Sequence, residues 1–290
     1  MKSAAFLFTL FLLPLQLVLG QTLRLNAIIL GHDTREGLPY VSIGIKNTAT
    51  GTTSDASGQF TLQANSRDTL VFSSVGYKTA VLLASEIASA VYLQEDVKAL
   101  HEVVVKSGRL KTTRVGNLKS KTYVSLGGAN QYAMLLQPDS GRGMLLEEVH
   151  FELQPDTREN NRWRTAIKVR VYANELGKPG RDLIPINLVV SADKKDRRIV
   201  VDVSQYAITV PREGVFIGID FIGFFDNKGD FVPYSPNNRP LNLRIPFSIT
   251  QASHRTFSRF FGTDWQLVRH RSSNSSLVNI SAKFGARLSF

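Results

Sequence analysis

The chain contains no cysteine among its 290 residues. Without thiols it forms no disulfide, offers no thiolate to a metal ion and has no thiol nucleophile. Exported eukaryotic proteins of this size often carry disulfides. The absence of cysteine therefore favours a protein of a bacterial cell envelope.

Long apolar runs are scarce, and the one that stands out lies at the N-terminus. Lys2 precedes an apolar stretch at residues 4–19, and Gly20 ends a segment with the small residues of a cleavage site. This pattern predicts a signal peptide at residues 1–20 and a mature chain from Gln21. The run is short for a membrane span, so no transmembrane helix is expected after cleavage. An uncleaved anchor is the alternative. The expected location is the periplasm or the outer membrane.

Acidic residues are fewer than basic ones, 24 against 35, which gives a net charge of +11 and a pI of about 9.9. An exported protein rarely meets nucleic acid, so no nucleic-acid partner is expected. Acidic glycans, anionic lipid headgroups in peripheral membrane association, or an acidic protein face suit this charge better. The plainer alternative is a basic surface that keeps the protein soluble.

Helical periodicity is scarce as well, whereas alternation of apolar and polar residues is frequent. It is clear at residues 23–27, 167–172 and 283–290, and turn-forming residues separate such segments at short intervals. This pattern predicts antiparallel sheet and an all-β fold of sandwiches or barrels. Only residues 84–90 suggest a short helix, of one or two turns.

The alternation divides the chain into two domains. A small β-sandwich is predicted at residues 21–95, and a larger β-sandwich or jelly-roll-like domain at 123–290. A basic linker is predicted between them at 96–122, because residues 106–121 contain six Lys or Arg and no acidic residue. The small domain has six expected strands, at 23–30, 40–46, 58–63, 69–74, 78–83 and 90–93. A surface loop is expected at 231–240.

The first domain resembles a known family. The resemblance rests on four segments: GLPYVSI at 37–43, GTTSD at 51–55, GQFTL at 58–62 and DTLVFSSVGY at 68–77. They resemble the carboxypeptidase-regulatory-like domain, a transthyretin-like β-sandwich of exported Bacteroidota proteins. Within it, Gly58 is expected to turn the chain with positive φ, and Asp55 to bind the backbone amides there.

Two further segments extend the resemblance. The acidic-valine run at 102–105 is similar to the segment that precedes the plug of TonB-dependent outer-membrane receptors. The remaining chain is too short for a plug and a barrel, so the implied alternative is an accessory component of such an uptake system. Residues 123–290 resemble an uncharacterised sandwich found behind regulatory-like domains in Bacteroidota, which implies no site residues.

The sequence carries no recognisable catalytic motif. None of the five histidines has a glutamate three residues later, as a zinc carboxypeptidase requires, and no Gly-x-Ser-x-Gly elbow or phosphate loop occurs. We therefore expect no enzyme activity, metal or cofactor. An unrecognised hydrolase on the second domain is the alternative, for which Glu147 or Glu148 could join Asp202 or Asp220, or a Ser-His-Asp triad could converge in space.

Aromatic and polar residues gather near position 230 and predict a binding loop. The candidate ligand-binding residues are Phe224, Phe225, Asp226, Asp230 and Tyr234. Aromatic rings stack on sugars or peptide side chains, and the neighbouring carboxylates accept hydrogen bonds or hold calcium. The alternative is a set of core aromatics followed by a polar turn.

A second group combines basic residues with aromatic ones, and its candidate contacts to an anionic partner are Arg255, Arg259, Arg269 and Arg271. A solvated loop is the alternative.

Taken together, these features predict a non-enzymatic, exported protein of the bacterial envelope that binds or scaffolds, with a glycan or an envelope protein as partner.

Overall fold

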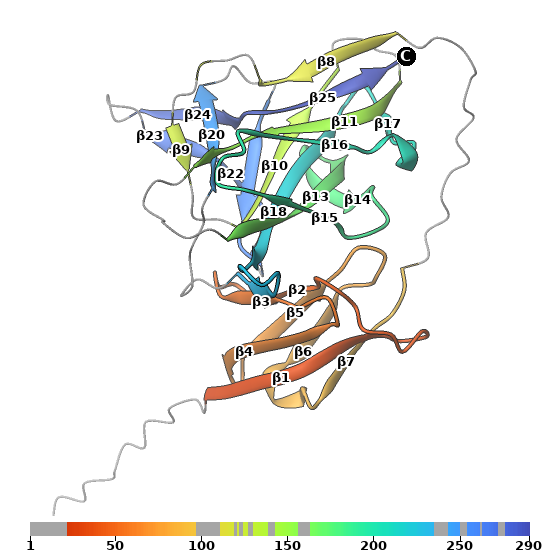
Figure 1. The fold of residues 1–290 in the computed structure, drawn as a ribbon, viewed down its shortest axis with the longest axis vertical. Helices are drawn as coiled ribbons and strands as arrows, with labels where there is room; N and C mark the ends of the chain where they lie inside the picture. Colours follow the sequence, from red (N-terminus) through yellow and green to blue (C-terminus); the bar gives the residue numbers. More distant parts are fainter. Residues whose placement is uncertain are drawn as a thin grey trace, which may run out of the picture.

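The computed structural model describes residues 22–96, 111–118, 121, 124–126, 130–138, 143–155, 163–234, 243–249, 254–261, 263–271 and 276–290. This part of the chain is all-β, as predicted, and it forms two sandwich-like units (Figure 1). Its helices are two 3-10 turns, η1 (Ala84–Glu86) and η2 (Ser204–Tyr206). No helix in these residues has the length and hydropathy needed to cross a membrane. The expected signal peptide lies outside the described residues.

The N-terminal unit consists of two small sheets. The first contains β4 (Gln59–Asn65), β1 (Thr22–Gly31) and β7 (Ala90–Leu93); the second contains β3 (Gly51–Thr53), β2 (Ser42–Ile45), β5 (Thr69–Ser73) and β6 (Ala80–Leu83). Alternate residues of β4 are buried, and Phe60 packs edge-on against Phe72 of the opposite sheet at 5.9 Å. The expected turn is present: Gly58 has φ of +87°, and the Asp55 carboxylate accepts the amides of Ser57 and Gln59.

Two details of this unit narrow or extend the expectation. The segment at 84–90, for which one or two helical turns were expected, contains the single 3-10 turn η1, because Ala90 already begins β7, which pairs in parallel with β1. Strand β3 was not expected, since three residues with one glycine give too short a pattern for alternation to be visible.

The C-terminal unit is built from three sheets. The eight-stranded sheet contains β14 (Lys178–Asp182), β13 (Arg164–Glu175), β18 (Val215–Phe225), β10 (Gln131–Leu136), β21 (Thr256–Arg259) and β22 (Gln266–Leu267), with β15 (Leu188–Ala192) beside β13 and β19 (Phe231–Pro233) beside β18. A five-stranded sheet contains β16 (Arg198–Asp202), β11 (Met144–Glu152), β25 (Phe284–Ser289) and β8 (Thr112–Gly116), with β17 (Thr209–Val210) beside β11. The other contains β12 (Gln154–Pro155), β20 (Leu243–Ile249), β24 (Leu277–Ala282) and β23 (Arg269–Arg271), with β9 (Val124–Leu126) beside β20.

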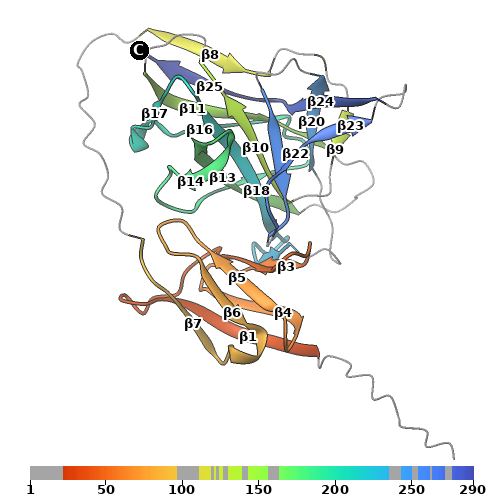
Figure 2. The same ribbon diagram turned by 180° about the vertical axis from the view of Figure 1, so that it is seen from behind.

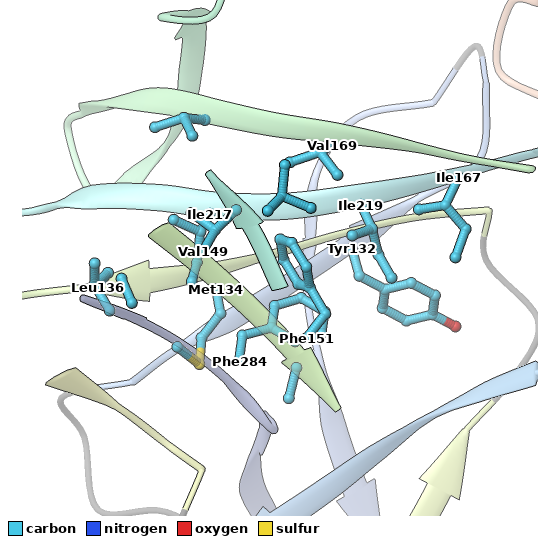
Figure 3. Packing of buried hydrophobic residues seen from close by; sticks show 14 of the residues in the cluster. Tyr132, Met134, Leu136, Val149, Phe151, Ile167, Val169, Ile217, Ile219 and Phe284 are labelled. Carbon is cyan, nitrogen blue, oxygen red and sulfur yellow. The ribbon is translucent and has the colours of Figure 1, made fainter. Parts of the chain in front are cut away.

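The core of this unit lies between the eight-stranded sheet and the other two. Figure 3 shows Val169 and Ile219 of the eight-stranded sheet near Phe151 and Phe284 of the sheet that faces it. The rings of Phe151 and Phe284 meet edge-on with centroids 4.8 Å apart. Burial of such alternating apolar faces stabilises the sandwich by roughly 25 cal/mol per Å² removed from water.

The predicted basic linker was wrong for part of its length. Residues 112–116 form β8, which pairs antiparallel with β25 and so belongs to the C-terminal unit. Val115 packs against the core, and this burial explains why a basic segment adopts a strand. Residues 97–110, which include the acidic-valine run, lie outside the described residues. Similarly, β19 occupies the start of the loop expected at 231–240.

The N-terminal unit packs on the outer face of the eight-stranded sheet, with β2 and β3 nearest to it in both views (Figures 1 and 2). Asn187 donates hydrogen bonds to the Pro39 carbonyl at 2.9 Å and to the Ser74 hydroxyl at 3.2 Å. Tyr40 and Phe231 meet edge-on with ring centroids 5.2 Å apart. The contact is therefore made by both backbone and side chains.

Candidate functional site

A row of polar residues crosses the outer face of the eight-stranded sheet beneath the N-terminal unit. Lys168 of β13 lies opposite Asp220 of β18, Asp220 lies opposite Gln131 of β10, and Gln131 lies opposite Arg259 of β21. Gln131 donates to the Asp220 carboxylate at 3.3 Å and accepts a hydrogen bond from Arg259. Because side chains alternate along strands, this row points away from the apolar core.

Arg170 joins this row through two ion pairs. Its guanidinium contacts the carboxylate of Asp220 at 3.2 Å and also that of Asp182 on β14. Burial alone would lower the pKa of Arg170, but Asp182, Tyr172 and Asp220 around it raise the pKa above its ordinary value. Burial raises the pKa of Asp182, although Arg170 opposes the shift. The cluster is therefore a desolvated network of opposite charges.

Lys168 connects the network to the N-terminal unit. Its side chain is fully buried, and its Nζ donates to the Tyr40 carbonyl at 2.6 Å. Burial, together with the nearby positive charge of Arg170, lowers the pKa of Lys168 to about 7, although Asp220 and Asp182 oppose the shift. Tyr40 presents this carbonyl from the left-handed region, with φ of 56°. Such a conformation in a non-glycine residue costs about 1–2 kcal/mol, so surrounding contacts must hold it.

A cavity of about 830 Å³ lies between the two units beside this network. The N-terminal unit contributes the segment from Ser73 to Thr79, and the C-terminal unit contributes residues of β13, β14, η2 and β17. Its aromatic and charged lining consists of Tyr77, Tyr172, Tyr206, Lys78, Arg170, Arg181, Arg259, Asp96 and Asp182. Its volume lies within the range of small-ligand sites, although its lining is more polar than is usual for them.

Three buried polar groups beside this cavity lack a hydrogen-bond partner among the described residues. They are the Tyr172 hydroxyl, Nε of Arg170 and Oδ1 of Asp182. Tyr172 is held by ring contacts instead, edge-on to Trp265 at 5.6 Å and beneath the Arg170 guanidinium at 5.2 Å. Since buried polar groups are normally hydrogen-bonded, this unused capacity singles out the wall of the cavity.

The predicted binding loop is organised differently from the expectation. Phe224 and Tyr234 are fully buried in the core, so they offer no surface to a ligand in this structure. Phe225 is half-buried against Phe231 at 5.8 Å. The Asp226 carboxylate accepts the amides of Lys228 and Asp230, at 2.8 and 3.0 Å, and so forms the turn. These contacts match the alternative of core aromatics followed by a polar turn.

The four predicted basic residues are divided between two sheets. Arg269 and Arg271 are exposed on β23, and Arg255 is exposed next to β21. Arg259 is half-buried, with its guanidinium 4.3 Å from the centroid of the Trp265 ring. Of the four, Arg259 lines the cavity between the units.

The carboxylates considered for hydrolysis lie on two different sheets. Glu148 of β11 is opposite Asp202 of β16 on one of the five-stranded sheets, whereas Asp220 belongs to the buried network of the eight-stranded sheet. Hydrogen bonds from His150 and Arg287 lower the pKa of Glu148, and hydrogen bonds from Ser204 lower that of Asp202. Both carboxylates therefore favour the ionised form. No group of metal-ligating side chains occurs in the described ranges.

Sequence reasoning missed the buried network because it treated the polar face of β13 as solvent-exposed. One signal was present: Asp220 is the only charged residue in the otherwise apolar strand Val215–Phe225. An isolated acid in such a strand requires a buried partner. The partner, however, comes from β13 and the cover from the N-terminal unit, and neither pairing is visible in the sequence.

The comparisons with known proteins concern the N-terminal unit. A search of curated proteins found no match to the chain. Residues 29–105 match the family model described as the CarboxypepD_reg-like domain, which covers β2 to β7 and the end of β1. This finding confirms the resemblance predicted from the sequence, for this part of the chain.

Proposed function

We propose that the protein is a non-enzymatic, exported binding or scaffolding protein of the bacterial cell envelope. The observation that carries the proposal is the cavity between the two units, which is lined by tyrosine, arginine and aspartate. Such side chains recognise ligands through stacking and charge-assisted hydrogen bonds. The partner is a glycan or an envelope protein.

Two features favour binding over catalysis. The matched family is a non-catalytic domain, here docked against the larger unit. The described residues that line the cavity include no histidine, so its serine and threonine hydroxyls have no imidazole base there. An envelope location rests on the signal-like sequence at residues 1–20 and on the absence of cysteine.

Cell fractionation tests the location. The full chain, expressed in a bacterium of the same envelope type, should be recovered in the periplasmic or outer-membrane fraction with residue 21 as its N-terminus. A variant without residues 1–20 is the matched control and should remain in the cytoplasm. Recovery of the full chain in the cytoplasm would contradict the proposed location.

Affinity capture from detergent-solubilised envelopes, followed by mass spectrometry and sugar analysis, tests the function. Enrichment of an outer-membrane receptor would make the protein an accessory component of an uptake system. Enrichment of a glycan would make it a stand-alone binding module. Cleavage of a captured glycan would refute the non-enzymatic role and favour the hydrolase alternative, and recovery of neither class would refute binding and scaffolding alike.

A further inference from the structure

We propose that the cavity between the two units binds an acidic saccharide, a short chain containing uronic acid. This inference rests on the proposed binding function and names the class of ligand. It is carried by the balance of charge in the lining, by the tyrosine rings and by the polar groups of the wall that lack partners. Each of these points to a different part of the ligand.

The charge of the lining favours a negatively charged ligand. It contains four basic side chains and two acidic ones, and Asp182 already pairs with Arg170. The exposed side chains of Lys78 and Arg181 lie at the rim, on opposite sides of the boundary between the units. Arginine matches the geometry of a carboxylate with two parallel hydrogen bonds. A uronic acid provides that carboxylate on each residue of a chain.

The tyrosines favour a saccharide over a simple anion. Tyr77 of the N-terminal unit and Tyr206 of η2 are half-buried in the lining, so each presents part of a ring as well as a hydroxyl. The apolar C–H face of a pyranose packs on such rings, and its hydroxyls accept and donate hydrogen bonds at the edges. An inorganic anion would leave these rings unused.

The wall of the cavity completes the site. The Tyr172 hydroxyl and Nε of Arg170 can donate, whereas Oδ1 of Asp182 can accept, and these three buried atoms have no hydrogen-bond partner in the described part of the chain. A ligand that satisfies all three must both donate and accept hydrogen bonds. Sugar hydroxyls do so, whereas a carboxylate or phosphate only accepts. The hydroxyls of a sugar fit the wall, and a carboxylate fits the basic rim. A sugar that carries a carboxylate therefore fits both parts of the cavity.

Calorimetric titration of the mature full-length protein tests the inference, with trigalacturonic acid as the probe and the neutral galactose trisaccharide as the comparison. The acidic probe should bind at least tenfold more tightly at low salt, and its affinity should fall as salt is raised. Equal affinity for both probes, or no binding of trigalacturonic acid, would overturn the assignment.

Three variants locate the site. Arg181→Ala removes a charge at the rim and Tyr172→Phe removes one hydroxyl from the wall while keeping the ring; each should weaken binding of the acidic probe at least fivefold. Arg269→Ala is the matched control, because it removes an exposed charge on β23 outside the cavity, and its affinity should stay within twofold of wild type. Thermal melting checks that each variant is folded.

The opposite pattern, with binding lost in Arg269→Ala and kept in the other two, would move the site to β23 and refute the cavity. Failure of the inference is distinguishable from failure of the proposed function. If trigalacturonic acid does not bind but affinity capture enriches an envelope protein, the binding or scaffolding role stands and the saccharide is refuted.

Discussion

Lys168 makes a direct contact between the two units through its side-chain amine. It is fully buried, and it donates to the Tyr40 carbonyl of the N-terminal unit. Its pKa falls to about 7 from an ordinary 10.5, chiefly because burial penalises the charged form. Folding therefore makes this amine release its proton at much lower pH than in the unfolded chain.

This shift predicts a pH dependence of stability. Between about pH 7 and 10.5 the unfolded chain binds the Lys168 proton more strongly than the folded chain does, so the free energy of unfolding rises with pH. The slope is at most about 1.4 kcal/mol per pH unit. Tyr172, whose raised pKa acts in the opposite sense, contributes only above its ordinary value of 10.0. Urea unfolding at pH 7.5 and 9.5 measures the difference.

The matched variant is Lys168→Met, which keeps an unbranched side chain and removes the titrating amine. Its free energy of unfolding should lose most of the rise between pH 7.5 and 9.5. An unchanged rise in this variant would show that another group titrates in the window. The ion pair of Arg170 with Asp220 does not involve Lys168, so the network keeps its main contact in this variant.

Individual residues also show how far the sequence could be interpreted. The alternation at 167–172 correctly predicted a strand with Ile167 and Val169 in the core. It could not show that Lys168 would be covered, because the cover is the backbone of Tyr40, more than a hundred residues earlier in the chain. The interpretation of Tyr234 differed from the structure for the opposite reason. Its polar, proline-rich neighbourhood indicated exposure, whereas the side chain is buried in the core.

At the scale of the elements, β8 pairs with β25 and forms one edge of the five-stranded sheet that also contains β11 and β16. Gly116 at the end of β8 has φ of +114°, and an added Cβ would lie 2.5 Å from Cα of Gly285. Gly116→Ala should therefore combine backbone strain with a clash and lower the free energy of unfolding by about 2–4 kcal/mol. Urea unfolding of the full chain checks this value.

Gly229 provides the control, because it has a similar positive φ of +88° but no atom within 4 Å of an added Cβ. Gly229→Ala should cost only the strain, about 1–2 kcal/mol. Equal losses for the two alanine variants would mean that β8 does not pack closely on β25. Nothing in the local sequence of β8 predicts this pairing, because its composition is polar and basic and its partner is the last strand of the chain.

At the scale of the whole molecule, specific polar and aromatic contacts join the two units. The bonds from Lys168 and Asn187 reach backbone or side-chain acceptors of the N-terminal unit, and the Tyr40 ring meets Phe231. Every acceptor in this set lies in the segments next to β2 and β5. The sequence predicted two domains but not this contact. Docking depends on pairs of residues in which the two members lie in different domains and far apart in the chain.

The contact predicts that the two units unfold together. Wild type should show one calorimetric transition, because the N-terminal unit gains stability from the larger one. The double variant Lys168→Met with Asn187→Ala removes the hydrogen bonds to Tyr40, Pro39 and Ser74, which amounts to about 2–3 kcal/mol. The transition should then split, with the N-terminal unit melting at the lower temperature.

Asp68→Ala is the control for that experiment, because the Asp68 carboxylate accepts a hydrogen bond from the Asn65 amide at 2.7 Å within the N-terminal unit. It removes a bond of the same kind without touching the boundary, so the melting temperature should fall slightly while the transition stays single. Two transitions in wild type, or a single one in the double variant, would mean that the contact does not couple the units. In that case the cavity between them would not have fixed walls, and a ligand would have to be bound by one unit alone.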